Sequence, residues 1–373
     1  MTAAALVDGL PSAELPLEEW SDAPFTWLGR ALDRVALRGM RLTLTPSLFP
    51  APEELERLRR SATPYLTAEL RADPRRFFDF LGEAPRIRRT RQREEGALEG
   101  GAVVQRSFAV EYEPFHAGGA WRSCPENDAV AVEHWMHRKR PPRATLLALH
   151  GFTMGQRHVD ARVLMAAHFF ELGFDLLLLT LPFHGCRAPS TSRYSGERFA
   201  SWDVSCLNES VRQAIHDVHV LRSWCLERNG APVGILGLSL GGYLSTLAAS
   251  LVSDWACVLP IVPPVCLAAI PTRLHALARP GPAQRPPLSR AQLRRAYRVH
   301  SPLAHQLAAP RARVLIVGGR GDQIVPPEHA YHLWRHWREP GIHWFSGGHM
   351  APFRRHRTLA RIDEHLRGLG LSD

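Results

Sequence analysis

The feature that most constrains this chain is a serine between glycines, at the point where one hydrophobic pattern gives way to another. Gly237-Leu238-Ser239-Leu240-Gly241 follows an apolar run at residues 232–236, which is typical of a buried strand. Apolar residues then recur at helical spacing up to Leu251. A serine at such a junction lies on a strained turn, and small neighbours keep the turn clear of the adjacent strand and helix. The pattern predicts a strand, a sharp turn and a helix whose positive end faces the Ser239 hydroxyl; an ordinary strand-to-helix turn is the alternative.

Strands and helices alternate along most of the chain from about residue 102. Strands are predicted at residues 103–112, 130–136, 144–149, 175–181, 232–236, 256–262, 313–317 and 342–345. Helices are predicted at residues 160–172, 208–228, 240–251, 327–337 and 358–366. We expect the first strand at the sheet edge, and Asn208 as the cap of the long helix that ends at Asn229-Gly230. Repeated strand–helix units favour the α/β class, with a mostly parallel sheet of about eight strands and helices on both faces.

Two segments depart from this alternation. Residues 1–95 are rich in proline and arginine, and we interpret them as an N-terminal helical extension that packs on the main domain, residues 96–373. Short helices are expected there at residues 52–60 and 75–81. The proline-rich block at residues 263–310 interrupts the main domain and predicts a lid over the site.

Two more polar residues follow predicted strands. Asp322 lies on a glycine-rich loop after the strand at 313–317, and His349 follows the strand at 342–345. A serine hydroxyl is a poor nucleophile at neutral pH, so it needs a base, and the base needs an orienting acid. Because carboxyl ends of parallel strands meet at one edge of a sheet, we expect Ser239, His349 and Asp322 to form a catalytic triad. Other acids compete less well for the third position, namely Asp203, Asp217 and Asp254.

An oxyanion formed at such a serine needs two N–H donors. One is expected from the backbone of Leu240, the residue after the nucleophile. The second is expected from the loop at residues 150–155, where we favour Phe152, with Thr153 as the alternative. A simple glycine turn is the other interpretation of this loop.

Taken together, these motifs resemble the α/β-hydrolase superfamily over about residues 102–373. The resemblance rests on four short motifs, namely His150-Gly151, the Ser239 turn, Gly321-Asp322 and Gly348-His349. It implies a central eight-stranded sheet, a Ser-His-Asp triad and hydrolysis of an ester, thioester or amide. The segment at residues 181–187 resembles the P-x-x-G-x-R loop of dienelactone-hydrolase and prolyl-oligopeptidase-like esterases. More loosely, it is similar to the domain of the mammalian hydrolases numbered eighteen in their series.

Other reactive side chains have two interpretations each. We take His184 and Arg187 as candidate substrate-binding residues, although a structural turn and a salt bridge are the alternatives. Cys186 is a weaker candidate nucleophile because no motif surrounds it. One helix carries histidines at zinc-like spacing, at His329, His332 and His336, but it lacks the glutamate of H-E-x-x-H. A packed or solvated histidine face is favoured, and we predict no metal and no cofactor.

Composition excludes several classes of function. The chain has 373 residues, of which 45% are hydrophobic and 22% charged, as in a globular domain, and no apolar run reaches the ~18 residues of a membrane span. Six scattered cysteines without a C-x-x-C pair, and no secretory signal pattern, favour a cytoplasmic location. The net charge of +10 is spread along the chain, with its densest run at Arg86–Arg93, so we expect a solvated face rather than a nucleic-acid partner.

The main hypothesis is therefore a serine hydrolase that cleaves a carboxylic ester through an acyl-enzyme. The substrate is expected to be a small-molecule or lipid ester, and the protein is not expected to insert stably into a membrane. Two alternatives stay open at this point. One is an acyltransferase with the same triad, and the other is a non-catalytic binding module on the same fold.

Overall fold

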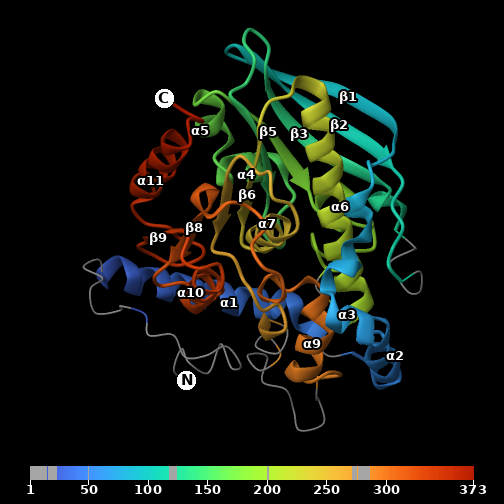
Figure 1. Cartoon of the computed structure of the whole chain (residues 1–373). Helices are drawn as coiled ribbons and strands as arrows, with labels where there is room; N and C mark the ends of the chain where they lie inside the picture. Colours follow the sequence, from blue (N-terminus) through green and yellow to red (C-terminus); the bar gives the residue numbers. More distant parts are fainter. Residues whose placement is uncertain are drawn as a thin grey trace.

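A twisted, mostly parallel sheet forms the centre of the molecule (Figure 1). The computed structural model describes residues 23–48, 50–116, 124–199, 201–270 and 286–373, together with the single residues 15 and 275. Within these residues the sheet has nine strands in the order β1-β2-β3-β5-β4-β6-β7-β8-β9. The pairs from β1 to β5 are antiparallel, and all pairs from β5 through β4 to β9 are parallel. The predicted α/β class and mostly parallel sheet are confirmed.

Eight strands overlap the segments predicted from the sequence. In chain order the strands are β1 Ile87–Leu98, β2 Gly101–Val110, β3 Ala129–His137, β4 Ala144–Leu149, β5 Phe174–Thr180, β6 Val233–Leu238, β7 Val258–Ile261, β8 Leu315–Gly319 and β9 Gly341–Phe345.

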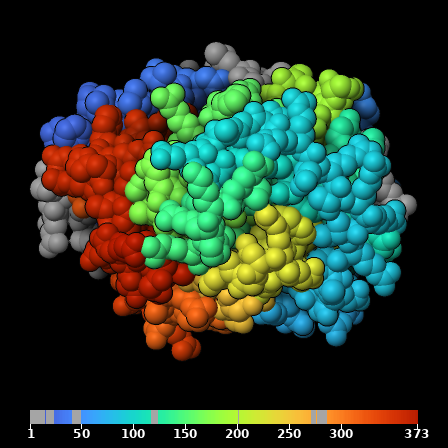
Figure 2. Space-filling view, turned by 90° about the horizontal axis from the view of Figure 1, so that it is seen from above, coloured from blue at the N-terminus to red at the C-terminus, as the bar shows by residue number. Residues whose placement is uncertain are grey.

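The additional strand is β1, which contains most of the basic run. It pairs with β2 along its length, for example Arg91 with Ser107, so β1 and not β2 is the edge of the sheet. Most of its side chains are exposed on both faces, which is why hydrophobic alternation did not reveal it. Figure 2 shows β1 and β2, in cyan, across one surface of the molecule. Charged side chains along an edge strand disfavour pairing with another chain.

Helices cover both faces of the sheet. They are α1 Ala23–Leu48, α2 Leu55–Arg60, α3 Ala68–Ala72, α4 Arg157–Val163, α5 Ala166–Glu171, α6 Val204–Asn229, α7 Leu240–Leu251, α9 Arg290–Ala296, α10 Pro327–His336 and α11 Arg355–Gly368. The helix expected at residues 160–172 is thus divided, because Met165 adopts a positive φ of 59°. None of the described helices is both long and apolar enough to cross a membrane.

Two hydrophobic cores follow from the alternation of side chains along each strand. On β4, Leu147 and Leu149 belong to the core that α6, α7 and α10 cover. Their neighbours Leu146 and Ala148 belong to the second core, under α5 and α11. Successive side chains of a strand point to opposite faces, so a strand covered by helices on both sides is apolar throughout.

The long helix α6 begins one turn earlier than expected. Its cap is Asp203, whose side chain accepts the Cys206 N–H at 3.2 Å. The prediction of Asn208 as the cap was wrong: Asn208 is fully buried within α6 and donates to the Ala296 carbonyl at 3.1 Å. The reason is that the buried pattern already starts at Val204. The predicted end is confirmed, since Gly230 adopts the left-handed conformation with φ 63°.

The N-terminal segments contact the main domain at two places. The 3-10 helix η5, Pro74–Gly82, and helices α2 and α3 place Leu58, Tyr65 and Phe77 in the core that α6 covers. In contrast, α1 crosses the molecule next to β8, β9 and α10 (Figure 1). Of the block expected as a lid, residues 271–274 and 276–285 lie outside the described residues. The described rest includes α9 and the 3-10 helices η9, Tyr297–His300, and η10, Pro302–Ala304.

Candidate active site

The turn between β6 and α7 holds Ser239 in a strained conformation, with φ 53° and ψ −111°. Such a backbone costs about 1–3 kcal/mol in a residue other than glycine. The glycines on either side are required by space. A Cβ on Gly237 would lie 2.0 Å from the Gly241 carbonyl oxygen, and a Cβ on Gly241 would lie 2.0 Å from the Leu149 carbonyl oxygen. The sharp turn leaves the Ser239 side chain half-buried at the edge of the sheet.

Asp322 lies on the loop that follows β8 and is fully buried. One carboxylate oxygen, Oδ1, accepts the N–H groups of Ile324 at 2.9 Å and Val325 at 2.7 Å. The other oxygen, Oδ2, lies 2.7 Å from His349 Nδ1. The loop therefore fixes the carboxylate by one oxygen and presents the other to the histidine.

His349 follows β9 and joins the two other residues. Its Nδ1 contacts Asp322, and its Nε2 lies 3.0 Å from Ser239 Oγ. Burial lowers the pKa of His349, but the charge and hydrogen bond of Asp322, with the charge of Asp33, raise it above the ordinary value overall. The structure thus brings together the three residues predicted as a triad. An imidazole that donates from Nδ1 to a carboxylate has a lone pair at Nε2, which suits it to accept a hydroxyl proton.

Two backbone segments lie next to Ser239. Leu240 is the first residue of α7, so its N–H has no acceptor within the helix. The loop after β4 approaches from the other side, since a Cβ on Gly151 would lie only 3.6 Å from Ser239 Cβ. Phe152, the next residue, is half-buried on this loop.

His150 supports this loop, although sequence analysis assigned it no role. Its Nδ1 donates to the Gly151 carbonyl at 2.8 Å, and its Nε2 accepts the Leu181 N–H at 3.1 Å. Burial lowers the pKa of His150 to about 4, so the ring stays neutral at neutral pH. The ring thereby links the loop after β4 to the loop after β5. Its position directly after a buried strand was the available signal.

Asp33, on α1, is a second residue that sequence analysis missed. It is fully buried, and its carboxylate accepts the N–H groups of His349 at 2.8 Å, Met350 at 3.0 Å and Gln323 at 2.8 Å. These N–H groups belong to the loops that carry His349 and Asp322. The available signal was an acidic residue on the same helical face as the buried Leu37.

The structure does not place the two candidate substrate-binding residues at the surface of the site. Arg187 is 1% exposed and pairs with Asp217 at 2.6 Å, and it also donates to the Thr180 carbonyl at 2.9 Å. His184 is fully buried, and its Nδ1 donates to the Pro182 carbonyl at 2.8 Å. Both side chains hold the loop after β5 in place. The sequence did not indicate this, because a short motif does not reveal which side of a loop is packed.

Other reactive side chains are engaged elsewhere or lie apart from the triad. Each competing acid has a structural partner: Asp203 caps α6, Asp217 pairs with Arg187 and Asp254 pairs with Arg222. On α10, His329 Nδ1 accepts the Val265 N–H at 3.0 Å, and His336 Nε2 donates to the His305 carbonyl at 2.8 Å. In the described part of the chain, no group of three or more histidine, cysteine or acidic side chains is placed to hold a metal ion.

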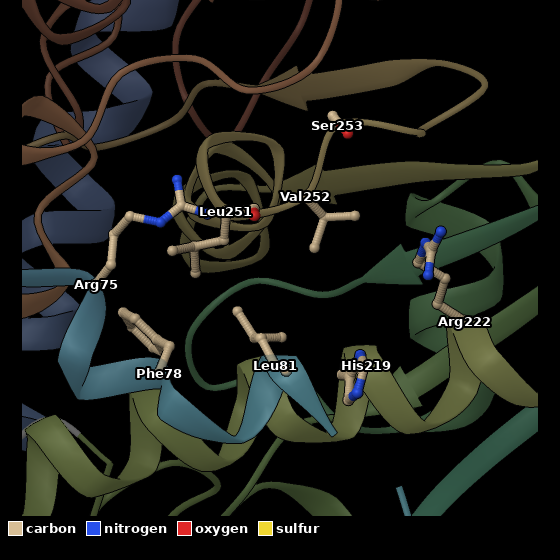
Figure 3. Close-up of a pocket in the computed structure, with 9 residues that line it drawn as sticks. Arg75, Phe78, Leu81, His219, Arg222, Leu251, Val252 and Ser253 are labelled. Atoms are coloured by element: carbon tan, nitrogen blue, oxygen red, sulfur yellow. Dashed lines mark hydrogen bonds between the residues drawn. The ribbon is translucent and has the colours of Figure 1, made fainter. Parts of the chain in front are cut away.

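Figure 3 shows a surface pocket of about 380 Å³ at a different place. Its lining residues come from η5, from α6 and from the end of α7 at Leu251–Ser253. Arg75 projects into it and donates to the carbonyls of Ser250 and Leu251, which end α7. Ser239 lies at the opposite end of this twelve-residue helix, about 18 Å away along its axis. The pocket is therefore separate from the triad.

Comparison with known proteins identifies related sequences over part of the chain. A family model described as alpha/beta hydrolase domain containing 18 matches residues 123–271, a span that includes Ser239 but neither Asp322 nor His349. An uncharacterized protein of Mycobacterium tuberculosis is 32% identical over 239 residues, which cover 63% of this chain and 57% of the relative. The corresponding protein of a second strain matches equally well. The chain thus spans somewhat more than half the length of the curated relatives that it matches.

Solved structures share the architecture at low sequence identity. Acetyl xylan esterase 1 from a Thermoanaerobacterium species has a TM-score of 0.53 at 14% identity, covering 87% of this chain and 95% of that one. An acetyl xylan esterase from a Paenibacillus species has a TM-score of 0.56 at 15% identity, covering 79% of this chain and 94% of that one. The chain therefore has the α/β-hydrolase fold, as the resemblance implied.

Proposed function

We propose that this protein is a serine hydrolase that cleaves carboxylic esters, with Ser239 as nucleophile, His349 as general base and Asp322 as the orienting acid. The observation that carries the proposal is the unbroken chain of contacts from Asp322 Oδ2 to His349 Nδ1, at 2.7 Å, and from His349 Nε2 to Ser239 Oγ, at 3.0 Å. The acetyl xylan esterases that share the fold support an ester as the substrate class.

The first step is proton transfer within the triad. Asp322 accepts the Nδ1–H of His349, which leaves the Nε2 lone pair directed at the Ser239 hydroxyl. His349 takes the hydroxyl proton while Ser239 Oγ forms a bond to the acyl carbon of the ester. The Asp322 carboxylate then stabilises the imidazolium.

The negative charge that develops on the acyl oxygen is stabilised by backbone donors. We assign the N–H of Leu240 and the N–H of Phe152 to this role. Leu240 adds the positive end of α7, whose dipole favours negative charge at this position. Loss of one such donor typically costs about 2.7–4 kcal/mol of transition-state stabilisation.

Collapse of the tetrahedral intermediate gives an acyl-enzyme. His349 returns its proton to the leaving alcohol, and the C–O bond to that alcohol breaks. A water molecule then gives a proton to His349 and attacks the acyl carbon. The bond between this carbon and Ser239 Oγ breaks, the acid is released, and His349 returns the proton to Oγ.

A small apolar cluster next to these loops bears on the substrate. Leu37 is buried there against half-buried neighbours that include Phe152 and Ile324, two residues beyond Asp322. An apolar group of the ester therefore has a surface to contact near the acyl carbon. We propose a small-molecule or lipid ester with a short or medium apolar group as the substrate.

The test is covalent labelling of the nucleophile. The wild type should react with a fluorophosphonate probe, and Ser239→Ala should not. Ser253→Ala is the matched control, because this exposed serine lies beside the separate pocket at the far end of α7. A panel of p-nitrophenyl esters of increasing chain length then defines the acyl group.

The outcomes separate the three hypotheses. Labelling that persists in Ser239→Ala refutes the nucleophile assignment, because another residue then reacts with the probe. A folded wild type that does not react favours the binding module. Transfer of the acyl group to an added alcohol in preference to water identifies an acyltransferase.

A further inference from the structure

Helix α1 lies in backbone contact with the loops that carry the base and the acid. A Cβ on Gly29 of α1 would lie 2.2 Å from the Gly348 nitrogen, and a Cβ on Gly348 would lie 2.6 Å from Asp33 Oδ2. A Cβ on Gly321, next to Asp322, would lie 2.6 Å from the Thr26 carbonyl oxygen. Three glycines at three separate places in the sequence thus allow one helix to approach both loops without intervening side chains.

The Asp33 carboxylate connects these loops through hydrogen bonds. Oδ2 accepts the N–H of His349 and the N–H of Gln323, both at 2.8 Å, and Oδ1 accepts the N–H of Met350 at 3.0 Å. One oxygen atom is therefore shared between the loop after β9 and the loop after β8. Bonds from N–H groups to a charged oxygen are stronger than neutral ones, and a fully buried carboxylate needs them to offset its lost hydration.

The same face of α1 also reaches the loop after β4. Leu37, one turn beyond Asp33, packs with Phe152, the residue to which we assign an oxyanion donor. Along α1, Gly29, Asp33 and Leu37 follow at intervals of four residues, so they share one face. One face of α1 thus contacts the three loops that carry His349, Asp322 and Phe152.

We propose that α1 is a component of the active site and that Asp33 is a positioning residue, which holds His349 in register with Asp322 and Ser239. The catalytic role of Asp33 in this inference rests on the proposed function. The two loops are already joined near their bases, where the Gly321 N–H donates to the Gly347 carbonyl at 2.7 Å. Further out, the shared acceptor limits the movement of Gln323 and His349 relative to each other. A misplacement of about 1 Å in such a site typically reduces the rate by about 10²-fold.

Asp33 also contributes charge to the base. The groups that face His349 are Asp322 from the loop after β8, Asp33 from α1 and the Ser239 hydroxyl from the turn. Burial lowers the pKa of His349, while both carboxylates raise it. Removal of the Asp33 charge should therefore move the His349 pKa downward, an effect that packing alone would not produce.

The test uses Asp33→Asn in the full chain. The amide oxygen can keep the two bonds to His349 and Gln323, whereas the amide nitrogen then faces the Met350 N–H. We expect kcat for a p-nitrophenyl ester to fall about tenfold with KM little changed, and the acid limb of the pH–rate profile to move to lower pH. Asp33→Ala removes both oxygens that accept the three N–H groups and should reduce kcat about 10²-fold.

Two matched variants should keep wild-type kinetics. Asp254→Asn makes the same change of charge beyond the far end of α7, where Asp254 is exposed and pairs with Arg222. Val35→Ala removes a side chain that is 64% exposed on α1, two residues from Asp33.

A second readout does not depend on activity. The imidazole pKa of His349 can be measured by NMR titration, with His349→Gln used for assignment. A lower pKa in Asp33→Asn supports the inference, even if fluorophosphonate labelling refutes the proposed hydrolase. A variant with wild-type kcat, acid limb and imidazole pKa, changed only in thermal stability, overturns it. If Asp33→Ala fails to fold, Asp33→Asn decides the question.

Discussion

The replacement Asp322→Asn tests how the site selects the tautomer of His349. Asp322 Oδ1 accepts the N–H groups of Ile324 and Val325, whereas Oδ2 faces His349 Nδ1. Asparagine has only one carboxamide oxygen, and the two backbone N–H groups hold it at the Oδ1 position. The amide nitrogen then faces Nδ1, so the imidazole must carry its proton on Nε2. In that form it cannot accept the proton of Ser239.

The size of the effect follows from the alternative orientation. Active enzyme requires the asparagine side chain to flip, which leaves two buried backbone N–H groups facing an NH₂ group. Each unsatisfied buried donor costs about 1–3 kcal/mol, so the flip costs roughly 2–6 kcal/mol. At about 1.36 kcal/mol per factor of ten, kcat should fall between ~30-fold and ~10⁴-fold.

The assay is kcat for p-nitrophenyl acetate at neutral pH, with a thermal unfolding measurement to show that the variant is folded. Asp254→Asn is the control for loss of one negative charge, because it lies in an exposed ion pair away from the triad. A folded Asp322→Asn enzyme with kcat within threefold of the wild type would refute the tautomer argument.

Three further predictions follow from the described residues. Burial lowers the pKa of His349, but its two carboxylate neighbours raise the pKa overall. On acidification kcat/KM should therefore decline with an apparent pKa above about 6.5. Full activity at pH 5 would contradict this. Burial lowers the pKa of His300 to about 3, below the value of about 6.5 that histidine has in the unfolded chain. The contribution of neutral His300 to stability is therefore complete above pH ~6.5 and is lost as the pH falls toward 3. His300→Gln should flatten the fall of Tm between pH 6.5 and 4. Gly241→Ala should abolish fluorophosphonate labelling, because its Cβ would lie 2.0 Å from the Leu149 carbonyl oxygen, whereas Gly82→Ala, with no atom within 4 Å of its Cβ, should label normally.

The parts of the site that lie next to regular elements could be predicted from the sequence. The apolar run of β4 and the helical spacing of α7 were predicted with the bounds that the structure has. Both signals are local: a strand buried on both faces is apolar throughout, and a buried helix repeats its apolar residues every three to four positions. Ser239 and Asp322 follow the buried strands β6 and β8, and His349 follows the half-buried β9, so their placement at one edge of the sheet follows from the order of the elements.

Other features depend on partners that are distant in the sequence. Strand β1 has charged side chains on both faces, so only its pairing with β2 defines it. Arg187 was a candidate substrate-binding residue with a salt bridge as the alternative, and in the structure it pairs with Asp217 inside the core at 2.6 Å. A side chain of this kind carries no local mark of burial, because its partner lies 30 residues away.

The sequence by itself therefore determined the alternation of strands and helices, the strained serine turn and the order of the three polar residues, since these follow from hydrophobic periodicity and glycine at short range. Only the tertiary structure decided which loops meet and what supports them. Asp33 is the clearest case, because its role depends on N–H groups about 290 and 316 positions further along the chain, at Gln323 and His349. Contacts over such separations are selected by packing of the whole domain, which no local pattern encodes.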